Sequence, residues 1–270
     1  MRHFAAPGYG GQHMHDQRPQ PARPLGILGA MPQEIDALLP HLESRRTTTR
    51  AGRDFHRGVL FGIEAVVVFS RWGKVAAAST ATELILLHDV RAVVFCGIAG
   101  ALDPSIARGD VVVARHLYQH DLDASPFFPP THVPLLNVSA LPTDEAVSAS
   151  LLKASDTFLR NDLPRDGGDL YRQAGLGAVK AVRADIASGD RVIFSETDRQ
   201  AVLACVPAAR CVEMEGAAAA QVCHEHGVPF ACVRTISDSA DGDGAEHVKP
   251  FFEGLAGVYT LGILRRWLTT

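Results

Sequence analysis

Two glutamates, Glu213 and Glu215, flank Met214 inside a run of small apolar residues, "CVEMEGAAAAQV" (211–222). An isolated buried carboxylate is costly, so two of them in such a run call for a chemical reason. Side chains at i and i+2 share a face on a strand but point apart on a helix. "ARCVEM" (209–214) has the character of a strand end and helix formers follow it, which predicts that both acids lie at a strand-to-helix junction.

Polar residues also follow other apolar segments. Glu34 comes after "LGILGAM" (25–31), the Ser70–Arg71–Trp72 group after "VVVF" (66–69), and Ser237 with Asp238 after "VRTI" (233–236). Ligands of open α/β sheets bind at the carboxyl ends of the strands, so we expect these residues to converge on one edge of the sheet.

Single residues in this set have simpler explanations. Glu34 can complement a helix dipole, and Asp238 can cap a helix. A buried Arg234 is harder to explain, because a guanidinium needs a carboxylate or a ligand, and Glu215 is the expected partner. No G-x-S-x-G elbow or G-x-x-x-x-G-K-[ST] phosphate loop is present. His116, His120 and Asp121 fit no standard metal spacing, which favours surface or structural roles.

The elements that must position these residues alternate between strand and helix from Leu25 onward. The segments that read as strands are 25–31, 59–70 (two strands joined at Gly62), 90–102 (ending in the glycine-rich turn "GIAG"), 109–121, 177–188, 209–214 and 229–237. Those that read as helices are 32–42, 73–89, 141–160 (opened by Thr143 or Asp144), 196–206, 217–225 (stopped by Gly227 and Pro229) and 245–268 (interrupted near Pro250).

This order predicts a single α/β domain over residues 25–270, with a mixed central sheet flanked by helices on both faces. Residues 1–24, rich in Pro, Gly, Gln and His, are expected to form a disordered tail without a secretory signal. A net charge of −4 gives no support for nucleic-acid or membrane binding, and no apolar run approaches the ~20 residues of a membrane span. Five cysteines without metal spacing indicate reduced thiols and a cytoplasmic protein.

Six segments, taken in order, carry a family resemblance: "GILGAMPQEI", "SRWGKVAAA", "CGIAGAL…GDVVVA", "SGDRVI", "VEMEGAAAAQVC" and "VPFACVRTISDSAD". Together they resemble the bacterial methylthioadenosine/S-adenosylhomocysteine nucleosidases of the purine nucleoside and uridine phosphorylase superfamily. The resemblance implies a phosphorylase-like fold and hydrolysis of the N-glycosidic bond of 5′-thio-substituted adenosines. It also implies a homodimer, a small-molecule nucleoside as substrate, and no metal or organic cofactor.

The resemblance also implies roles for individual residues. Glu34 matches the base that activates water, and Asp238 the acid that protonates N7 of adenine. Glu215 and Met214 match the residues that hold the ribose hydroxyls, and Arg234 the arginine that helps position water. Glu213 is expected to brace the site, and Phe251 or Phe252 to cover the alkylthio tail. The candidate substrate-binding residues are Met31, Ala99, Gly100, Val192, Ile193, Glu213, Met214, Glu215, Arg234, Ser237 and Phe251.

Two departures from the family pattern bear on substrate preference. Ile98 stands where relatives commonly carry a small hydroxyl residue, and Val192 replaces a frequent aromatic, which predicts weaker stacking on adenine. The loop "SPFFPP" (125–130) is the candidate wall that a neighbouring subunit supplies to the alkylthio pocket.

Two alternative functions stay open. A nucleoside phosphorylase needs anion-binding groups where this chain has Pro32, Gln33 and Glu34. Arg71 is a side chain that could bind an anion, so this alternative stays open. A non-catalytic nucleoside-binding module would need no acid–base pair, so Glu34 together with Asp238 argues against it.

Overall fold

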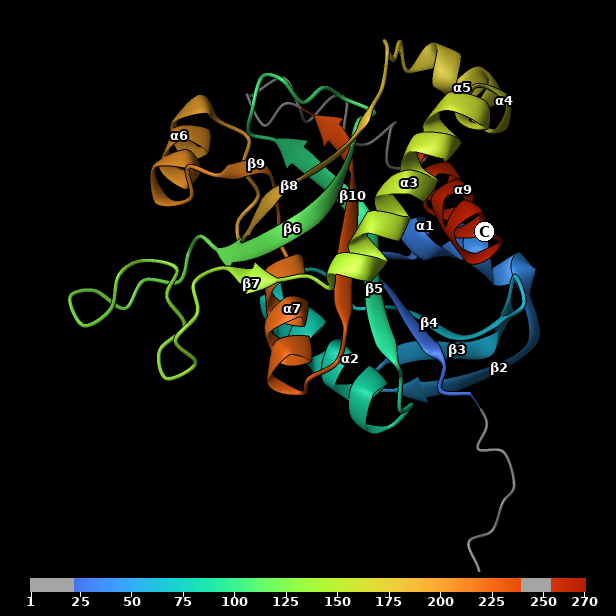
Figure 1. The fold of residues 1–270 in the computed structure, drawn as a ribbon, viewed down its shortest axis with the longest axis horizontal. Helices are drawn as coiled ribbons and strands as arrows, with labels where there is room; N and C mark the ends of the chain where they lie inside the picture. The colour runs from blue at the N-terminus through green and yellow to red at the C-terminus, as the bar shows by residue number, and fades with distance from the viewer. Residues whose placement is uncertain (1–21, 239–253) are drawn as a thin grey trace, which may run out of the picture.

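The computed structural model describes residues 22–238 and 254–270 as one α/β domain built around a ten-stranded mixed sheet (Figure 1). The strands are β1 Leu25–Gly29, β2 Leu42–Arg50, β3 Arg53–Leu60, β4 Ile63–Phe69, β5 Ala92–Ala101, β6 Val111–Gln119, β7 Leu141–Pro142, β8 Ala181–Ser188, β9 Ala209–Glu213 and β10 Phe230–Asp238. The helices are α1 Pro32–Ile35, the 3₁₀ helix η1 Asp36–His41, α2 Lys74–Leu86, α3 Glu145–Asn161, α4 Leu163–Asp166, α5 Gly168–Gln173, α6 Glu196–Cys205, α7 Gly216–Glu225 and α9 Ala256–Leu268. The predicted fold class is confirmed.

The sheet has two parts that share β5. On one side β5, β1 and β4 are parallel, and β3 and β2 continue the sheet antiparallel to its edge. On the other side β5 pairs with both β10 and β9, while β6 and β8 connect those two strands. Five strands (β5, β10, β6, β8 and β9) therefore form a closed ring, which brings the ends of distant segments together.

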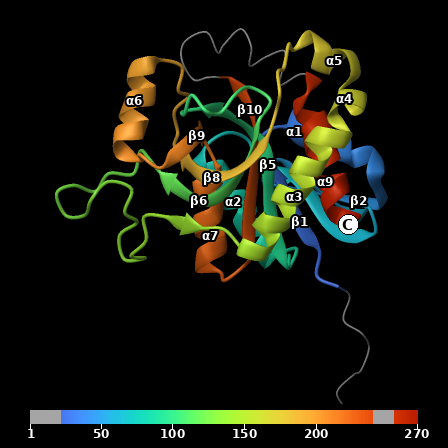
Figure 2. The ribbon, with the colours of Figure 1, turned by 45° about the horizontal axis from the view of Figure 1, so that its top comes forward.

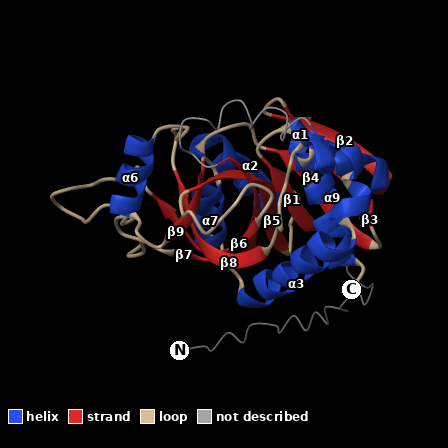
Figure 3. Cartoon of the chain, turned by 90° about the horizontal axis from the view of Figure 1, so that it is seen from above, coloured by secondary structure: helices blue, strands red, loops and turns tan. Residues whose placement is uncertain are grey.

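Helices cover both faces of the sheet, as predicted. Helices α2 and α7 pack together over one face, and α3 and α9 pack together over the other (Figure 3). Strand β5 shows why both faces are apolar. Val93 and Phe95 belong to the core under α2 and α7, whereas Val94 and Cys96 point into the opposite core. Alternate side chains of one apolar strand thus point to opposite faces of the sheet and contribute to two separate cores.

The helix predicted over 32–42 is wrong for most of its length. α1 contains only four residues, and a 3₁₀ turn with Pro40 inside it follows directly. Proline lacks the amide hydrogen that a helix interior needs, which prevents a regular helix from continuing. Strand β2, which the sequence did not reveal, begins at Leu42 and has only that residue buried. Its exposed "ESRRTTTR" has no apolar alternation to mark it as a strand.

The turn predicted at "GIAG" is also wrong. β5 runs on through Gly97 and Gly100 to Ala101, because β10 and β9 supply hydrogen-bonding partners on either side of this stretch. Tertiary pairing therefore overrides the local tendency of glycine to form turns.

The strand-to-helix junction at the two glutamates is confirmed. β9 ends at Glu213, Glu215 is the N-cap residue of α7, and α7 ends at Glu225 just before Gly227, which has φ +64°. The expected start of the 141–160 helix is also confirmed, since the Asp144 side chain accepts a hydrogen bond of 2.9 Å from the Val147 amide.

Several predictions lie outside the described residues, namely the tail as far as residue 21, the loop after Asp238, the break near Pro250, and Phe251 with Phe252. Within the tail range, Arg23 pairs with Asp89 (Nη2 to Oδ1, 2.7 Å), so ordered structure begins before Leu25.

Over 22–238 and 254–270, no helix has the length and apolarity needed to cross a membrane. All five cysteines are free thiols, as expected.

Candidate active site

A cavity of about 410 Å³ opens where the carboxyl ends of several strands meet. The residues that line it are Ala30, Met31, Glu34, Trp72, Ile98, Ala99, Gly100, Arg191, Val192, Ile193, Phe194, Val212, Glu213, Met214, Glu215, Ser237 and Asp238. Most of the candidate site residues are among them. Arg234 is buried beside the cavity rather than in its lining, and Phe251 lies outside the described residues. The colours in Figure 2 show that these segments come from both the early and the late parts of the chain.

Glu34 lies on α1 with only 3% of its surface exposed. Its Oε2 accepts hydrogen bonds from the amides of Ala30 (2.6 Å) and Met31 (3.0 Å), and its Oε1 accepts one from Ile98 (3.1 Å). Burial raises the pKa of Glu34 above its usual value, although Arg234 and these amides oppose the shift. The carboxyl group is thus fixed in place and is a stronger base than an exposed glutamate.

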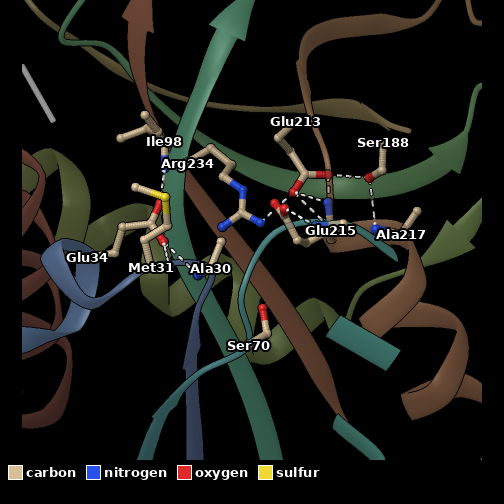
Figure 4. Close-up of polar contacts among 12 residues, drawn as sticks. Ala30, Met31, Glu34, Ser70, Ile98, Ser188, Glu213, Glu215, Ala217 and Arg234 are labelled. Carbon is tan, nitrogen blue, oxygen red and sulfur yellow. Dashed lines mark hydrogen bonds and ion pairs between the residues drawn. The ribbon is translucent and has the colours of Figure 1, made fainter. Parts of the chain in front are cut away.

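Arg234 lies between Glu34 on one side and the two glutamates of the junction on the other (Figure 4). Its Nη2 pairs with Glu213 Oε2 at 2.5 Å, and its guanidinium lies 4.2 Å from the centre of the Phe95 ring. The prediction that Glu215 is its partner is wrong. β9 ends at Glu213, so the strand alternation that would have placed both acids on one face does not reach Glu215.

Nη1 of Arg234 faces the Glu34 side of the site. Nε and Nη1 are buried without a hydrogen-bond partner among the described residues. A Cβ placed on Gly97 would lie 2.6 Å from Glu34 Oε1 and 2.7 Å from Arg234 Nη1. The absence of a side chain at Gly97 therefore lets the Glu34 carboxylate and the unpaired Nη1 of Arg234 approach the same small space.

Glu213 has protein partners on both oxygens. It accepts hydrogen bonds from the amides of Glu215 (3.1 Å) and Gly216 (2.8 Å) and from the Ser188 hydroxyl, besides its ion pair with Arg234. Ser188 Oγ in turn accepts from the Ala217 amide at 2.8 Å. The carboxylate thus satisfies the first amides of α7 and anchors Arg234, which is the geometry of a brace.

Glu215 faces the cavity and is 5% exposed. Its Oε1 accepts a hydrogen bond of 2.7 Å from the Gly73 amide, which comes from the start of α2. Burial, together with the negative charge of Glu213, raises the pKa of Glu215 to about 8. Glu215 is therefore largely protonated below that pH, and Met214 lies next to it in the cavity wall.

Asp238 and Ser237 lie at the end of β10, and the Ser237 hydroxyl donates to Asp238 Oδ2 at 2.7 Å. The pairing of β10 with β5 changes register between Ile236 and Asp238, which brings Asp238 opposite Gly100. Such irregularities re-aim side chains beside active sites. Here the result is a second carboxyl group in the cavity, from a strand remote in sequence from Glu34.

The loop after β8 forms another wall, with Ile193 6% exposed and Val192 43% exposed. Phe194, which had no predicted role, also lines the cavity, so an aromatic ring is available two positions beyond Val192. Trp72, which was expected at this edge of the sheet, also lines the cavity; it is 59% exposed and its Nε1 donates to Met31 Sδ.

Two side chains that favoured other functions lie elsewhere. Arg71 is not part of the cavity lining, and its Nη2 donates to the Gly52 carbonyl at 2.8 Å. His116 lies 3.2 Å from Asp185 (Nδ1 to Oδ1), and no group of three potential metal ligands occurs in 22–238 and 254–270.

Comparisons with known proteins connect this geometry to a family. Residues 24–256 match the phosphorylase superfamily. A 5′-methylthioadenosine/S-adenosylhomocysteine nucleosidase of Shewanella sp. (strain W3-18-1) is 35% identical over 219 residues, which cover 81% of this chain and 87% of that protein. This chain belongs to the phosphorylase superfamily and, within it, to the methylthioadenosine/S-adenosylhomocysteine nucleosidases.

Solved structures of other nucleosidases agree with the fold. The enzyme of Colwellia psychrerythraea 34H in complex with adenine has a TM-score of 0.79 and 32% identity, and the match covers 91% of this chain and 94% of that one. The enzyme of Neisseria meningitidis in complex with methylthio-immucillin-A has a TM-score of 0.80 and 27% identity, and covers 92% of this chain and 99% of that one. The nucleosidase fold is therefore present over almost the whole described chain.

Proposed function

We propose that this nucleosidase hydrolyses the N-glycosidic bond of 5′-thio-substituted adenosines, releasing adenine and a thioribose product. Methylthioadenosine and S-adenosylhomocysteine are the expected substrates, in keeping with the names of its relatives. The observation that carries the proposal is the presence of Glu34 and Asp238 in one cavity, supplied by elements far apart in the chain.

Each carboxyl group has a distinct task in this reaction. Cleavage builds positive charge on the ribose and negative charge on the departing adenine. Asp238 protonates N7 of the base, and Glu34 removes a proton from the attacking water. The raised pKa of Glu34 suits a general base, because a carboxylate of ordinary pKa accepts protons poorly near neutrality. The two groups act from opposite sides with water between, as in inverting glycosidases.

The other buried polar groups support those two acids. Arg234 has an unpaired donor, Nη1, beside Glu34, where a water molecule can be oriented for attack. Glu215 accepts hydrogen bonds from the ribose hydroxyls, and its negative charge, when present, stabilises the cationic sugar. Glu213 is assigned here as a brace for Arg234 and α7 rather than as a substrate ligand. The reaction needs no metal or organic cofactor.

The phosphorylase alternative has less support. Arg71, the residue that favoured it, does not line the cavity. Arg191 does, but its Nη2 is paired with Asp198 at 2.6 Å. Glu34 lies beside the position of the nucleophile. Its charged form repels phosphate, but it can accept a proton from an attacking water molecule.

We infer further that the enzyme is a cytoplasmic homodimer. The free state of all five thiols supports a reducing compartment. The segment between β6 and β7 projects from the body of the protein (Figures 1 and 2) and contains Phe127, which is 85% exposed. A large exposed aromatic side chain on a projecting loop suits contact with a second subunit.

The test measures adenine release from methylthioadenosine, first with phosphate rigorously absent and then with phosphate added. We expect phosphate-independent release by the wild type and a kcat lower by at least ~100-fold in Asp238→Asn and in Glu34→Gln. Asp156→Asn, which breaks an exposed ion pair with Arg160 on α3, is the control and should keep wild-type activity. Release that requires phosphate and yields a sugar 1-phosphate would move the chain to the phosphorylases.

A further inference from the structure

Three segments near the cavity are joined by charged side chains that take no part in the proposed reaction. They are the start of α2, the end of β6 and the loop that follows β8. We propose that Lys74, Asp121 and Asp190, together called the loop clamp, are positioning residues that fix the adenine-contacting loop Asp190–Phe194 relative to Glu215. This inference rests on the proposed function, in which Glu215 binds the ribose, and on the resemblance to the nucleosidases, which places Val192 of this loop beside the adenine.

The loop clamp is a closed set of three hydrogen bonds. The backbone amide of Lys74 donates to Asp190 Oδ1 (2.7 Å), and Lys74 Nζ donates to Asp121 Oδ1 (2.6 Å). Asp121 Oδ2 accepts the third bond, from the backbone amide of Asp190 (2.9 Å). Each segment is therefore tied to both of the others, and Asp190 is held through its backbone as well as its side chain.

Consecutive amides at the start of α2 reach the two sides of the substrate site. The Gly73 amide donates to Glu215 on the ribose side, and the Lys74 amide donates to Asp190 on the base side. Gly73 has φ +91°, and a Cβ there would lie 2.9 Å from Asp190 Oδ1. A side chain at this position would be both strained and obstructed. One peptide unit thus sets the spacing between the ribose acid and the base loop.

The ion pair within the loop clamp is partly shielded from solvent. The Lys74 side chain is 17% exposed and the Asp121 side chain 30% exposed, so their attraction is screened less than that of a surface pair. Burial acts to raise the pKa of Asp121, but its hydrogen bonds with Lys74 and the Asp190 amide lower the pKa below its ordinary value overall. The negative charge that holds the loop is thereby maintained.

Other contacts hold the loop farther along. Arg191 pairs with Asp198 on α6, and Ile193 packs into a small apolar cluster with Val202 and Val206. These contacts fix the middle of the loop, whereas the loop clamp fixes its start against α2. Loss of the loop clamp should therefore shift the base-contacting wall while Glu215 and the sugar side stay in place.

The experiment compares direct binding of adenine and of S-methyl-5-thioribose, measured by calorimetry on the full chain. In Asp190→Ala the acceptor for the Lys74 amide is gone, and we expect the Kd for adenine to rise about tenfold. The Kd for methylthioribose should change less than about threefold. Asp190→Asn keeps an oxygen for that amide and should stay near wild type for both ligands.

Asp121→Asn and Lys74→Met complete the design. Both oxygens of Asp121 face donors, so an amide group there must leave one donor unpaired, and Asp121→Asn should behave like Asp190→Ala. Lys74→Met keeps its backbone bond to Asp190 and should have a smaller effect on adenine binding. Asp156→Asn is again the control, and thermal unfolding of every variant shows whether the fold is retained.

The outcomes separate this inference from the proposed function. Equal losses for both ligands, unchanged adenine binding in Asp190→Ala, or an Asp190→Asn variant as impaired as Asp190→Ala would overturn the loop clamp. Wild-type protein that binds adenine selectively through the loop clamp but releases none from methylthioadenosine would overturn the proposed function and leave the loop clamp standing.

Discussion

The close approach of Glu34 and Arg234 is the feature of single residues on which the proposed chemistry depends most. Both side chains are almost fully buried, and both lie within 3 Å of where a Cβ on Gly97 would be. A carboxylate beside the unpaired Nη1 of a guanidinium creates a polar site in an otherwise apolar region. Such a site is suited to holding one water molecule for attack on the sugar.

Gly97→Ala tests that arrangement. The added methyl group would lie within 3 Å of both Glu34 Oε1 and Arg234 Nη1, so it should displace them and fill the water position. We expect kcat for methylthioadenosine to fall at least ~10-fold and stability to drop by about 1–3 kcal/mol. Gly177→Ala, at a position with open space, is the matched control. Wild-type kcat in Gly97→Ala would contradict the assignment of the water site.

The raised pKa of Glu215 should be visible in the stability of the protein. The folded state keeps a proton on this group up to about pH 8, whereas the unfolded chain releases it near 4.5. The native state therefore binds more protons between these values, and this contribution to stability is lost as the pH rises through the window. Glu34 shifts in the same direction.

Glu215→Gln should consequently lose less stability than the wild type between pH 5 and pH 8. The difference in the free energy of unfolding should amount to a few kcal/mol at most, measured by urea denaturation at both pH values. Histidines with lowered pKa act in the opposite direction, but they are common to both proteins and cancel in the comparison. Parallel pH profiles would show that Glu215 is ionised in the native state at pH 5.

At the scale of elements, the junction between β9 and α7 performs two tasks through Glu213. The same carboxylate satisfies the first amides of α7 and neutralises Arg234 on β10, so it couples a helix to a strand across the site. The alanine-rich start of α7 packs closely against α2, whose first residues in turn hold Glu215 and Asp190. The positions of the ribose and base walls are thus linked through two helix N-termini.

Glu213→Gln removes the charge from that junction while preserving its size. Arg234 would be left as a buried cation without its partner, which should destabilise the protein by about 3–5 kcal/mol and lower kcat. Ser188→Ala, which removes a neutral hydroxyl partner of the same carboxylate together with the acceptor of the Ala217 amide, should cost about 1–2 kcal/mol. Equal effects in urea denaturation would indicate that the ion pair does not dominate the junction.

At the scale of the whole molecule, the closed ring of five strands explains how the site is assembled. Residues from the first strand, the middle of the chain and the last strand reach one cavity because β5 belongs to both the ring and the open sheet. The segment between β6 and β7 lies outside this body, where Phe127 and Leu135 are 85% and 94% exposed. This is the surface at which we expect a second subunit.

Sedimentation equilibrium should therefore give about twice the chain mass of 28.9 kDa. Phe127→Asp places a charge in the proposed contact and should raise the KM for methylthioadenosine by about tenfold or dissociate the dimer. Leu170→Asp changes an exposed apolar residue on α5 and is the control. A monomeric wild type, or a dimer whose KM is indifferent to Phe127→Asp, would show that this loop does not complete the site.

The alternation of strands and helices was readable from the sequence because it depends on local periodicity, capping and stop signals. The junction at Glu213 and Glu215, the Asp144 cap and the end of α7 just before Gly227 are examples. The candidate acids could be chosen in the same way, since a carboxyl group at the end of an apolar strand is unusual wherever that strand lies in the fold.

Contacts between remote segments were decided only by the tertiary structure. The pairing of Arg234 with Glu213, the course of β5 through "GIAG", and the place of Phe194 each depend on strand register and on neighbours far away in the chain. The loop clamp, which joins residues 74, 121 and 190, is of the same kind. Local sequence determines which face of an element is apolar, but the partner of a buried charge is set by how the elements pack.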